Sequence, residues 1–388
     1  MKIMKTLRRG AALFLCAVLV LTLGACGFQS RLEGFINASL YMVGEQNPAN
    51  HSQLIIKTSD DAEYMSFEAF MGAVMMAGMT EDFSFVENKK IGLDIVSKAY
   101  DGNAEIKLGW IGEDSEIEPL VSFIVDGTDL YIGTEILDLA GPYLSLAMPS
   151  LLALGEYDYI KIAGSDDPLY GSFAPPEDTD VAALLTGLSE KLSGAFKENA
   201  AAVLTEDFDK TLTEKGGVYT LSLNTESFIN LLTSVLELVA GNGEEVAGTL
   251  KQFVTALGMP DAAITGADVI QYAEEALTAA KVLDIAELPN FELMFSVKAE
   301  GKDEQKKHSV EMVFRAPEET MNKFREMVPP VTEEGSGIVL PKMVDISVTS
   351  VNTVQTEEIG LPEGSSVIDM ADAEELIMDG FGSLPTAG

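Results

Sequence analysis

The chain has 388 residues and a formal net charge of −37, because 62 acidic residues outnumber 25 lysines and arginines. A surface this acidic repels phosphate backbones and anionic lipid headgroups, which argues against nucleic-acid binding and against membrane adhesion by charge. The acidic residues are scattered and 47% of the residues are hydrophobic. This composition is that of a folded protein with a large core rather than of a disordered chain.

The N-terminal segment has the pattern of a secretory signal. Residues 1–9 are basic and contain no acid, and residues 11–23 are apolar. This apolar run is shorter than the roughly 20 residues that a membrane-spanning helix needs, so we expect a cleaved signal peptide over residues 1–25. The two cysteines are Cys16, within the signal, and Cys26, directly after it. The mature chain is therefore expected to have no disulfide and no cysteine-based metal site.

The sequence Leu23-Gly24-Ala25-Cys26 resembles the lipobox of bacterial lipoproteins. This resemblance implies cleavage between Ala25 and Cys26, and a diacylglycerol attached to the Cys26 sulfur. Two acyl chains are enough for stable anchoring, so the expected location is the extracytoplasmic face of the cell membrane. The alternative is an ordinary secretory signal in which the cysteine stands by chance.

In the first half of the chain, helical patterns precede two strand hairpins. In chain order the predicted elements are a helix at 28–45, an apolar run at 54–56, a helix at 64–79, strands at 91–96, 104–110, 121–125 and 130–132, an apolar helix at 134–154 that is interrupted at Pro142 and Pro149, and a strand at 157–162. Asp101-Gly102 and Asp126-Gly127 stand between the paired strands. An Asp-Gly pair between alternating runs is a strong hairpin signal.

The second half begins with a loop rich in turn-forming residues at 163–179, which is the best internal boundary. The elements predicted after it are a helix at 181–203, strands at 210–215 and 218–223, helices at 225–240, 244–257 and 266–283, and strands at 291–299, 308–315 and 342–354. Strands come in hairpins and helices come in runs. This order predicts an α+β fold with an antiparallel sheet that helices cover on one face.

Two short motifs, Val125–Ile132 (VDGTDLYI) and Gly216–Leu221 (GGVYTL), occur in these hairpins. Together with the lipobox they resemble lipoproteins of Firmicutes, whose architecture is similar to that of the lipoprotein-carrier families. The resemblance covers residues 84–355. It implies a curved antiparallel sheet around a hydrophobic cavity closed by helices, and it assigns a role to no individual residue.

These patterns give an expected domain organisation. It comprises the signal peptide at 1–25, a lipid-anchored segment at 26–50, an α+β domain at 51–360 with a subdivision near 163–179, and an acidic tail at 361–388. The tail is also glycine-rich, which is typical of a partly ordered terminus.

The sequence contains no strong catalytic motif, since nucleophile-elbow, zinc-protease and phosphate-loop patterns are all absent. The two histidines, His51 in a polar loop and His308 at the start of a strand, are both expected to be exposed surface residues. Acidic groups such as Asp60-Asp61 offer oxygen ligands for calcium, but none has the register of an EF-hand loop. We therefore expect no enzyme activity, no cofactor and no metal site. Two carboxylates that converge in one cleft would favour a hydrolase instead.

A methionine-rich segment is the most suggestive feature of the chain. Methionine is flexible and polarizable, so it suits a surface that adapts to varied apolar partners. One interpretation is a buried helix whose methionines fill gaps in the core. The other is a ligand cavity, to which the apolar helix at 134–154 would also contribute. The candidate cavity residues are Met65, Phe70, Met71, Met75, Leu137 and Leu144.

Two functions fit these observations. The first is a membrane-anchored, extracytoplasmic, non-enzymatic lipoprotein that holds a hydrophobic or lipid ligand between its sheet and its helices. The alternative is an envelope structural or protein-interaction lipoprotein without a small-molecule ligand, whose acidic loops contact a partner protein. A solute receptor for an importer is disfavoured, because its two α/β lobes would require a regular alternation of strands and helices.

Overall fold

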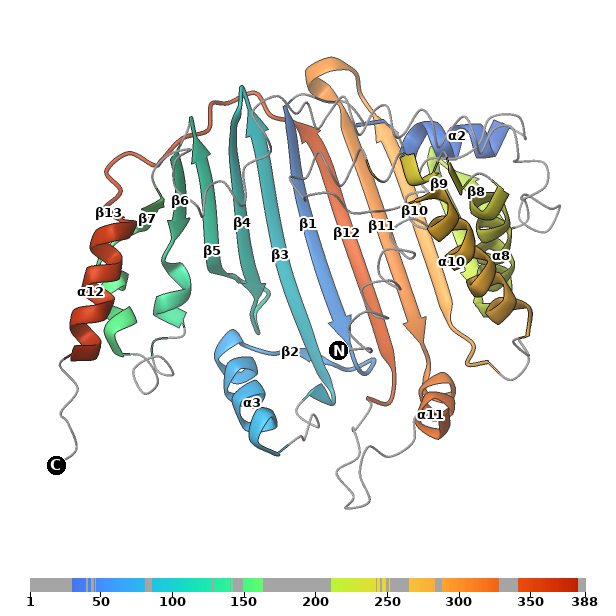
Figure 1. Ribbon diagram of the computed structural model, residues 1–388, viewed down its shortest axis with the longest axis horizontal. Coiled ribbons are helices and arrows are strands. Elements are labelled where there is room, and N and C mark those ends of the chain that lie inside the picture. The colour runs from blue at the N-terminus through green and yellow to red at the C-terminus, as the bar shows by residue number, and fades with distance from the viewer. Residues whose placement is uncertain are drawn as a thin grey trace. The chain divides into compact units, whose positions relative to one another are not determined.

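The computed structural model describes most of the chain from Ser30 onward (Figure 1). The described residues are 30–39, 41–42, 45, 47–80, 86–127, 129–139, 141, 149–162, 211–241, 243–244, 246–248, 251, 265–282, 288–327 and 341–382. Several predictions lie outside them: the signal peptide and lipobox with Ala25 and Cys26, the loop at 163–179, the helix at 181–203, most of the helix at 244–257, and Leu144.

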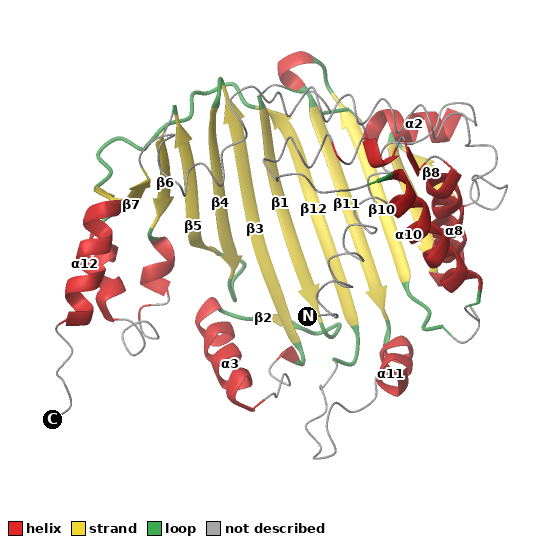
Figure 2. Cartoon of the chain, in the orientation of Figure 1, coloured by secondary structure: helices red, strands yellow, loops and turns green. Residues whose placement is uncertain are grey.

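The fold is α+β, as predicted, and thirteen strands form a large, mostly antiparallel, open and curved sheet (Figure 2). The chain divides into two compact units. The first comprises Met1–Glu45, Pro175–Lys302 and Lys306–Met312, and the second comprises Gln46–Ala174, Asp303–Gln305 and Val313–Gly388. Strand β11 (Lys307–Ala316) contributes residues to both units.

The second unit holds most of the sheet, in the strand order β13-β7-β6-β5-β4-β3-β1-β12, with β2 beside β3. The strands are β1 (Pro48–Lys57), β2 (Glu63–Tyr64), β3 (Lys89–Tyr100), β4 (Asn103–Ile111), β5 (Ile117–Asp126), β6 (Asp129–Gly133), β7 (Tyr159–Ile162), β12 (Val344–Val354) and β13 (Val367–Asp369). Its helices are α3 (Phe67–Thr80), the 3-10 helices η2 (Pro149–Glu156) and η3 (Asp303–Gln305), α11 (Glu318–Met327) and α12 (Met370–Gly382).

The hairpins form at the turns that the sequence predicts. Asp101 and Gly102, between β3 and β4, both have positive φ angles, of 48° and 87°. Two positive φ values in a two-residue loop match the right-handed twist of the flanking strands. Strand β1 pairs antiparallel with β3 on one side and with β12 on the other, so a strand near the start of the chain lies beside one near its end (Figure 1).

Helices pack on one face of this sheet. Phe67 of α3 is buried against Trp110 of β4 and Leu120 of β5. At the β13 edge, α12 and η2 cover the same face through a cluster that consists of Leu154, Ile368 and Ala373, with Ile160 of β7 packed against them. The expected covering of one sheet face by helices is thus present in this unit.

The first unit is a smaller sheet-and-helix layer. Its elements are α2 (Ser30–Ser39), β8 (Leu212–Lys215), β9 (Val218–Asn224), α8 (Thr225–Gly241), α10 (Gly266–Lys281), β10 (Glu292–Glu300) and the first part of β11. Alternate residues of β9, Leu221 and Leu223, are buried with Phe35 of α2 and Val235 of α8. Helix α10 packs on α8 and begins at a capping box between Thr265 and Asp268.

Each of the two histidines departs from its prediction in one respect. His51 lies in β1 rather than in a loop, because pairing with β3 and β12 draws the polar residues before Leu54 into the sheet. Its side chain is 51% exposed. His308 lies at the start of strand β11, as predicted, but its predicted surface exposure is wrong, because the residue is only 6% exposed. This burial lowers its pKa below the usual value, because an imidazolium ion would lose its hydration.

Two further segments bear on the predictions. Of the interrupted helix predicted at 134–154, the described residues form α-helix at 135–139 and the 3-10 helix η2, which begins at Pro149, one of the two predicted points of interruption. The segment expected as an acidic tail contains β13 and α12. Between its acidic residues stand Ala373, Leu376 and Ile377, which share one side of α12 and pack onto the sheet.

Candidate functional site

Strand alternation gives the second unit two chemically different sheet faces. The register places the residues of one face opposite one another across five neighbouring strands; they are Ile346, Val348, Ser350 and Asn352 of β12, Asn50, Ser52, Leu54 and Ile56 of β1, Ile91, Leu93, Ile95 and Ser97 of β3, Ala104, Ile106, Leu108 and Trp110 of β4, and Val121, Phe123 and Val125 of β5. We call this the uncharged face. Within these strands its charged residues are Lys89 and Glu118, at one end of β3 and of β5.

The uncharged face is incompletely covered at its centre. None of the ten residues of β1 is buried, although β1 has a strand on each side. Leu54 and Ile56 are half-exposed, and Ile106 on β4 is 43% exposed. Exposed apolar side chains scattered singly are ordinary, whereas a contiguous group on one face is a candidate binding surface.

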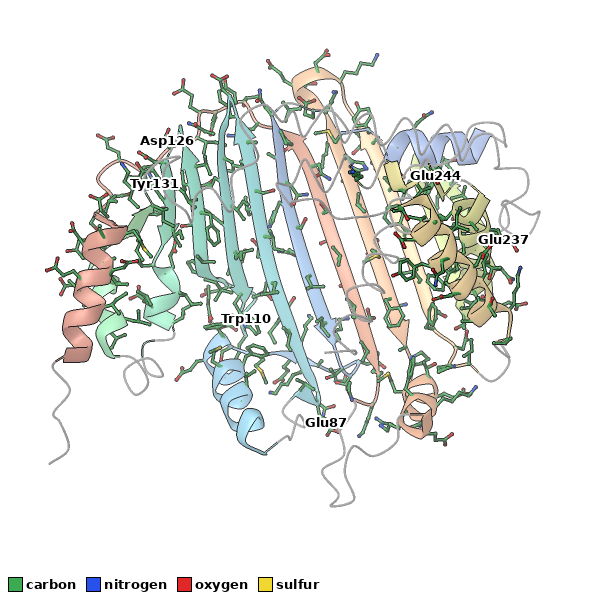
Figure 3. All side chains as sticks on the ribbon, in the orientation of Figure 1. Glu87, Trp110, Asp126, Tyr131, Glu237 and Glu244 are labelled. Carbon is green, nitrogen blue, oxygen red and sulfur yellow. The ribbon has the colours of Figure 1, made fainter. Side chains whose placement is uncertain are left out.

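Helix α3 covers one end of this face, around Trp110 (Figure 3). The Trp110 indole N–H donates a 2.6 Å hydrogen bond to the backbone carbonyl of Met65. The Phe67 ring meets the indole edge-on with a centroid distance of 5.6 Å, and the Phe70 ring lies 4.8 Å away. Met71 packs against the same cluster. The cluster fixes α3 on the sheet and covers this end of the uncharged face.

The candidate cavity residues separate into three groups. Met65, Phe70 and Met71 come together around Trp110. Leu137 packs instead in the α12 cluster at the sheet edge. Met75 lies in α3, but its side chain is outside the described residues, as is all of Leu144. The sequence interpretation missed Trp110 as the centre of the group, although its alternation within β4 already placed it on the apolar face.

A small polar cluster interrupts the uncharged face at the other end of β1. The Asn50 side-chain amide donates hydrogen bonds to Ser350 Oγ (2.6 Å) and to Asn352 Oδ1 (2.7 Å). The Ser52 hydroxyl donates to Asn50 Oδ1 (2.7 Å). All four side chains are half-exposed. We call these four residues the Asn50 cluster. Sequence reasoning missed it, because two of its members lie in β12, some 300 positions away.

The opposite face carries the charges, and they are mostly paired. Lys107 on β4 lies 2.8 Å from Glu105 Oε1, and Lys98 on β3 lies 3.5 Å from Glu105 Oε2. The hydrogen bond to Glu105 raises the pKa of Lys107, against the opposing effect of burial. Near the sheet edge Lys161 pairs with Asp129 at 2.8 Å, which raises the pKa of Lys161. Glu105 and Asp129 thus offset most of the positive charge of these three lysines.

Two arrangements on the charged face have components of catalytic sites. His51 Nε2 lies 2.7 Å from Asp94 Oδ1, which also accepts a hydrogen bond from Gln53. A carboxylate that orients a half-exposed imidazole is two parts of a triad, but among the described residues no hydroxyl or thiol is hydrogen-bonded to His51. Ser122 donates to Glu135 Oε1 at 2.7 Å, yet Ser122 is only 1% exposed and thus closed to substrate. His51 and Gln53 satisfy Asp94 Oδ1, and Ser122 satisfies Glu135 Oε1, while the buried Glu135 Oε2 has no hydrogen-bond partner in the described structure.

Other kinds of site find little support in the part of the chain that the structure describes. Within that part, no three histidine, cysteine, aspartate or glutamate side chains gather closely enough to hold a metal ion. None of its helices combines the length and the apolar character that crossing a membrane demands. Comparison with known proteins gives no match: no protein-family model, curated protein or solved structure matches the chain.

Proposed function

We propose that the protein is a lipid-anchored, extracytoplasmic, non-enzymatic lipoprotein that binds a hydrophobic ligand on the uncharged face of its sheet. The lipobox around Cys26 supports the anchor. The half-exposed apolar centre of the sheet supports the ligand, because the described helices cover its ends and not its middle strand.

The observation that carries the proposal is the incomplete burial of the apolar side chains of β1. A central strand of a structural sheet normally buries one side-chain face, yet Leu54 and Ile56 stay partly exposed between equally apolar neighbours on β3 and β12. Full burial of an aliphatic side chain contributes about 1.5–3 kcal/mol, so completing the burial of one that is already mostly buried contributes roughly 0.5 kcal/mol. The seven aliphatic side chains of this face on β12, β1 and β3 would give an apolar ligand a gross gain of about 3–4 kcal/mol, before the cost of association.

Two neighbouring substitutions on β1 test this proposal. Leu54→Asp places a carboxylate at the centre of the uncharged face, whereas Ile55→Asp places it on the opposite face, between Gly92 and Ser347. The probe is the neutral fluorophore N-phenyl-1-naphthylamine, added to the full chain carrying Cys26→Ser so that no acyl chains compete. We expect Leu54→Asp to weaken binding at least fivefold, because an ionised carboxylate is costly to bury against an apolar ligand.

The Ile55→Asp variant is the matched control and should bind the fluorophore like the parent chain. Any fluorophore that binds to the apolar residues 11–23 does so in all variants, so this contribution cancels in the comparison. If both substitutions change binding equally, or neither does, the uncharged face is not a ligand surface. That result would shift the assignment to the alternative, an envelope protein-interaction lipoprotein.

A further inference from the structure

The Asn50 cluster adds chemical information about what the uncharged face binds. Along β1 the side chains of this face run Asn50, Ser52, Leu54 and Ile56, so the surface changes from polar to apolar within one strand. Six residues of strand span about 20 Å. Neighbouring β3 repeats the change, from Ser97 beside Asn50 to Leu93 beside Leu54. The apolar part continues to the Trp110 cluster, because Leu93 packs there.

The Asn50 cluster can still donate one hydrogen bond and accept others. A serine hydroxyl offers one proton and two lone pairs. Ser350 accepts from Asn50, and among the hydrogen bonds of the described residues its own proton is unused. Ser52 donates to Asn50, which leaves its lone pairs available as acceptors. A ligand group with hydroxyl or ester oxygens matches a site that can both donate and accept.

On the uncharged face of the five strands, no charged side chain lies beside the Asn50 cluster. Lys89 lies eight residues along β3 from Ser97, about 26 Å at the rise of a strand. Glu118 lies beside Trp110, in the half of the face that α3 covers. An ionised group at the Asn50 cluster would thus lose hydration without gaining a counter-charge, which is unfavourable.

We infer that the ligand of the uncharged face is a neutral amphiphile whose hydroxyl- or ester-bearing head lies at the Asn50 cluster and whose apolar chain extends over Leu54 and Leu93 toward Trp110. This inference rests on the proposed function and refines it. It assigns the head of the ligand to the Asn50 end of β1 and its chain to the apolar part of β1, β3 and β4, and it excludes phosphate-bearing and carboxylate-bearing lipids as preferred ligands.

The test is displacement of N-phenyl-1-naphthylamine from the full Cys26→Ser chain by two amphiphiles that share one acyl chain. Monodecanoylglycerol has a neutral head, and decanoyl-lysophosphatidate has the same head with a phosphate. We expect monodecanoylglycerol to displace the fluorophore at a concentration at least tenfold lower. Asn50→Leu should raise the concentration of monodecanoylglycerol needed for displacement about tenfold. The concentration of lysophosphatidate needed should stay unchanged.

A second variant and a control guard against a purely structural effect. Ser350→Ala removes one hydroxyl of the cluster and should raise the monodecanoylglycerol concentration about threefold. Thr349→Val, one residue away on the opposite face of β12, should have no effect. Equal displacement by the two amphiphiles, or unchanged displacement in both cluster variants, would overturn the inference. If fluorophore binding already fails to depend on Leu54, the proposed function itself is wrong, so the two failures are distinguishable.

Discussion

Removal of the Phe67 ring is the sharpest test of how α3 is held on the sheet. Phe67 is 6% exposed, touches Trp110 edge-on and packs with Leu120. Truncation of a buried phenylalanine to alanine costs about 3–5 kcal/mol, which combines lost burial with the cavity that remains. Phe67→Ala should therefore lower the free energy of unfolding of the second unit by about 4 kcal/mol.

The assay is urea unfolding followed by intrinsic fluorescence. The chain has one tryptophan, Trp110, so its emission reports this cluster alone. With a urea dependence of about 2 kcal/mol per molar, the midpoint should fall by about 2 M. If Phe67→Ala is too unstable to purify, Phe67→Leu, with an expected cost of about 1 kcal/mol, gives the same comparison.

Val74→Ala provides the control on the same helix, because Val74 is 41% exposed. Its effect should stay within about 0.5 kcal/mol, since exposed positions contribute little and alanine favours helix. A midpoint shift below about 0.5 M for Phe67→Ala, or equal shifts for the two variants, would refute the buried aromatic cluster as the contact that holds α3.

Two further predictions concern other parts of the chain. The parent chain should incorporate labelled palmitate and fractionate with membranes, and Cys26→Ser should lose both properties; label retained in the variant would contradict the lipobox. Burial lowers the pKa of His308 below 6.5, so the unfolded chain binds a proton more readily than the folded one. The stability associated with a neutral His308 is full above pH 6.5 and is lost as the pH falls below this value. The gap in urea midpoint between the parent chain and His308→Gln should therefore narrow between pH 7.5 and pH 5, whereas parallel profiles would argue against this burial.

Local signals carried most of the successful predictions. The hairpin at Asp101-Gly102 is confirmed, because the turn residues and the alternating strands point to the same structure. Helix α8 matches its predicted range almost residue for residue, since its apolar spacing packs against the sheet beneath it. The α+β class followed from the order of these elements.

The errors arose where distant pairing decides the structure. The polar first half of β1 has no strand pattern of its own, and only its register with β3 and β12 makes it a strand. His51 was consequently placed in a loop. The same distance hides the Asn50 cluster, whose members meet only across β1 and β12. The segment of α12 was predicted as a tail because of its acidic composition. Its few apolar residues indicate a packed helix only once η2 and β13 lie beside them.

The pairing of β1 with β12 also determines when the protein can finish folding. Asn50 and Asn352 are hydrogen-bonded although they stand 302 positions apart. A chain that emerges N-terminus first can join β1 to β3 early, but the other edge of β1 stays open until nearly all residues have appeared. Such remote contacts slow folding, and an open strand edge invites pairing with other chains. Assembly of the sheet centre is thus a late event, and the protein is most prone to aggregation just before its last long strand arrives.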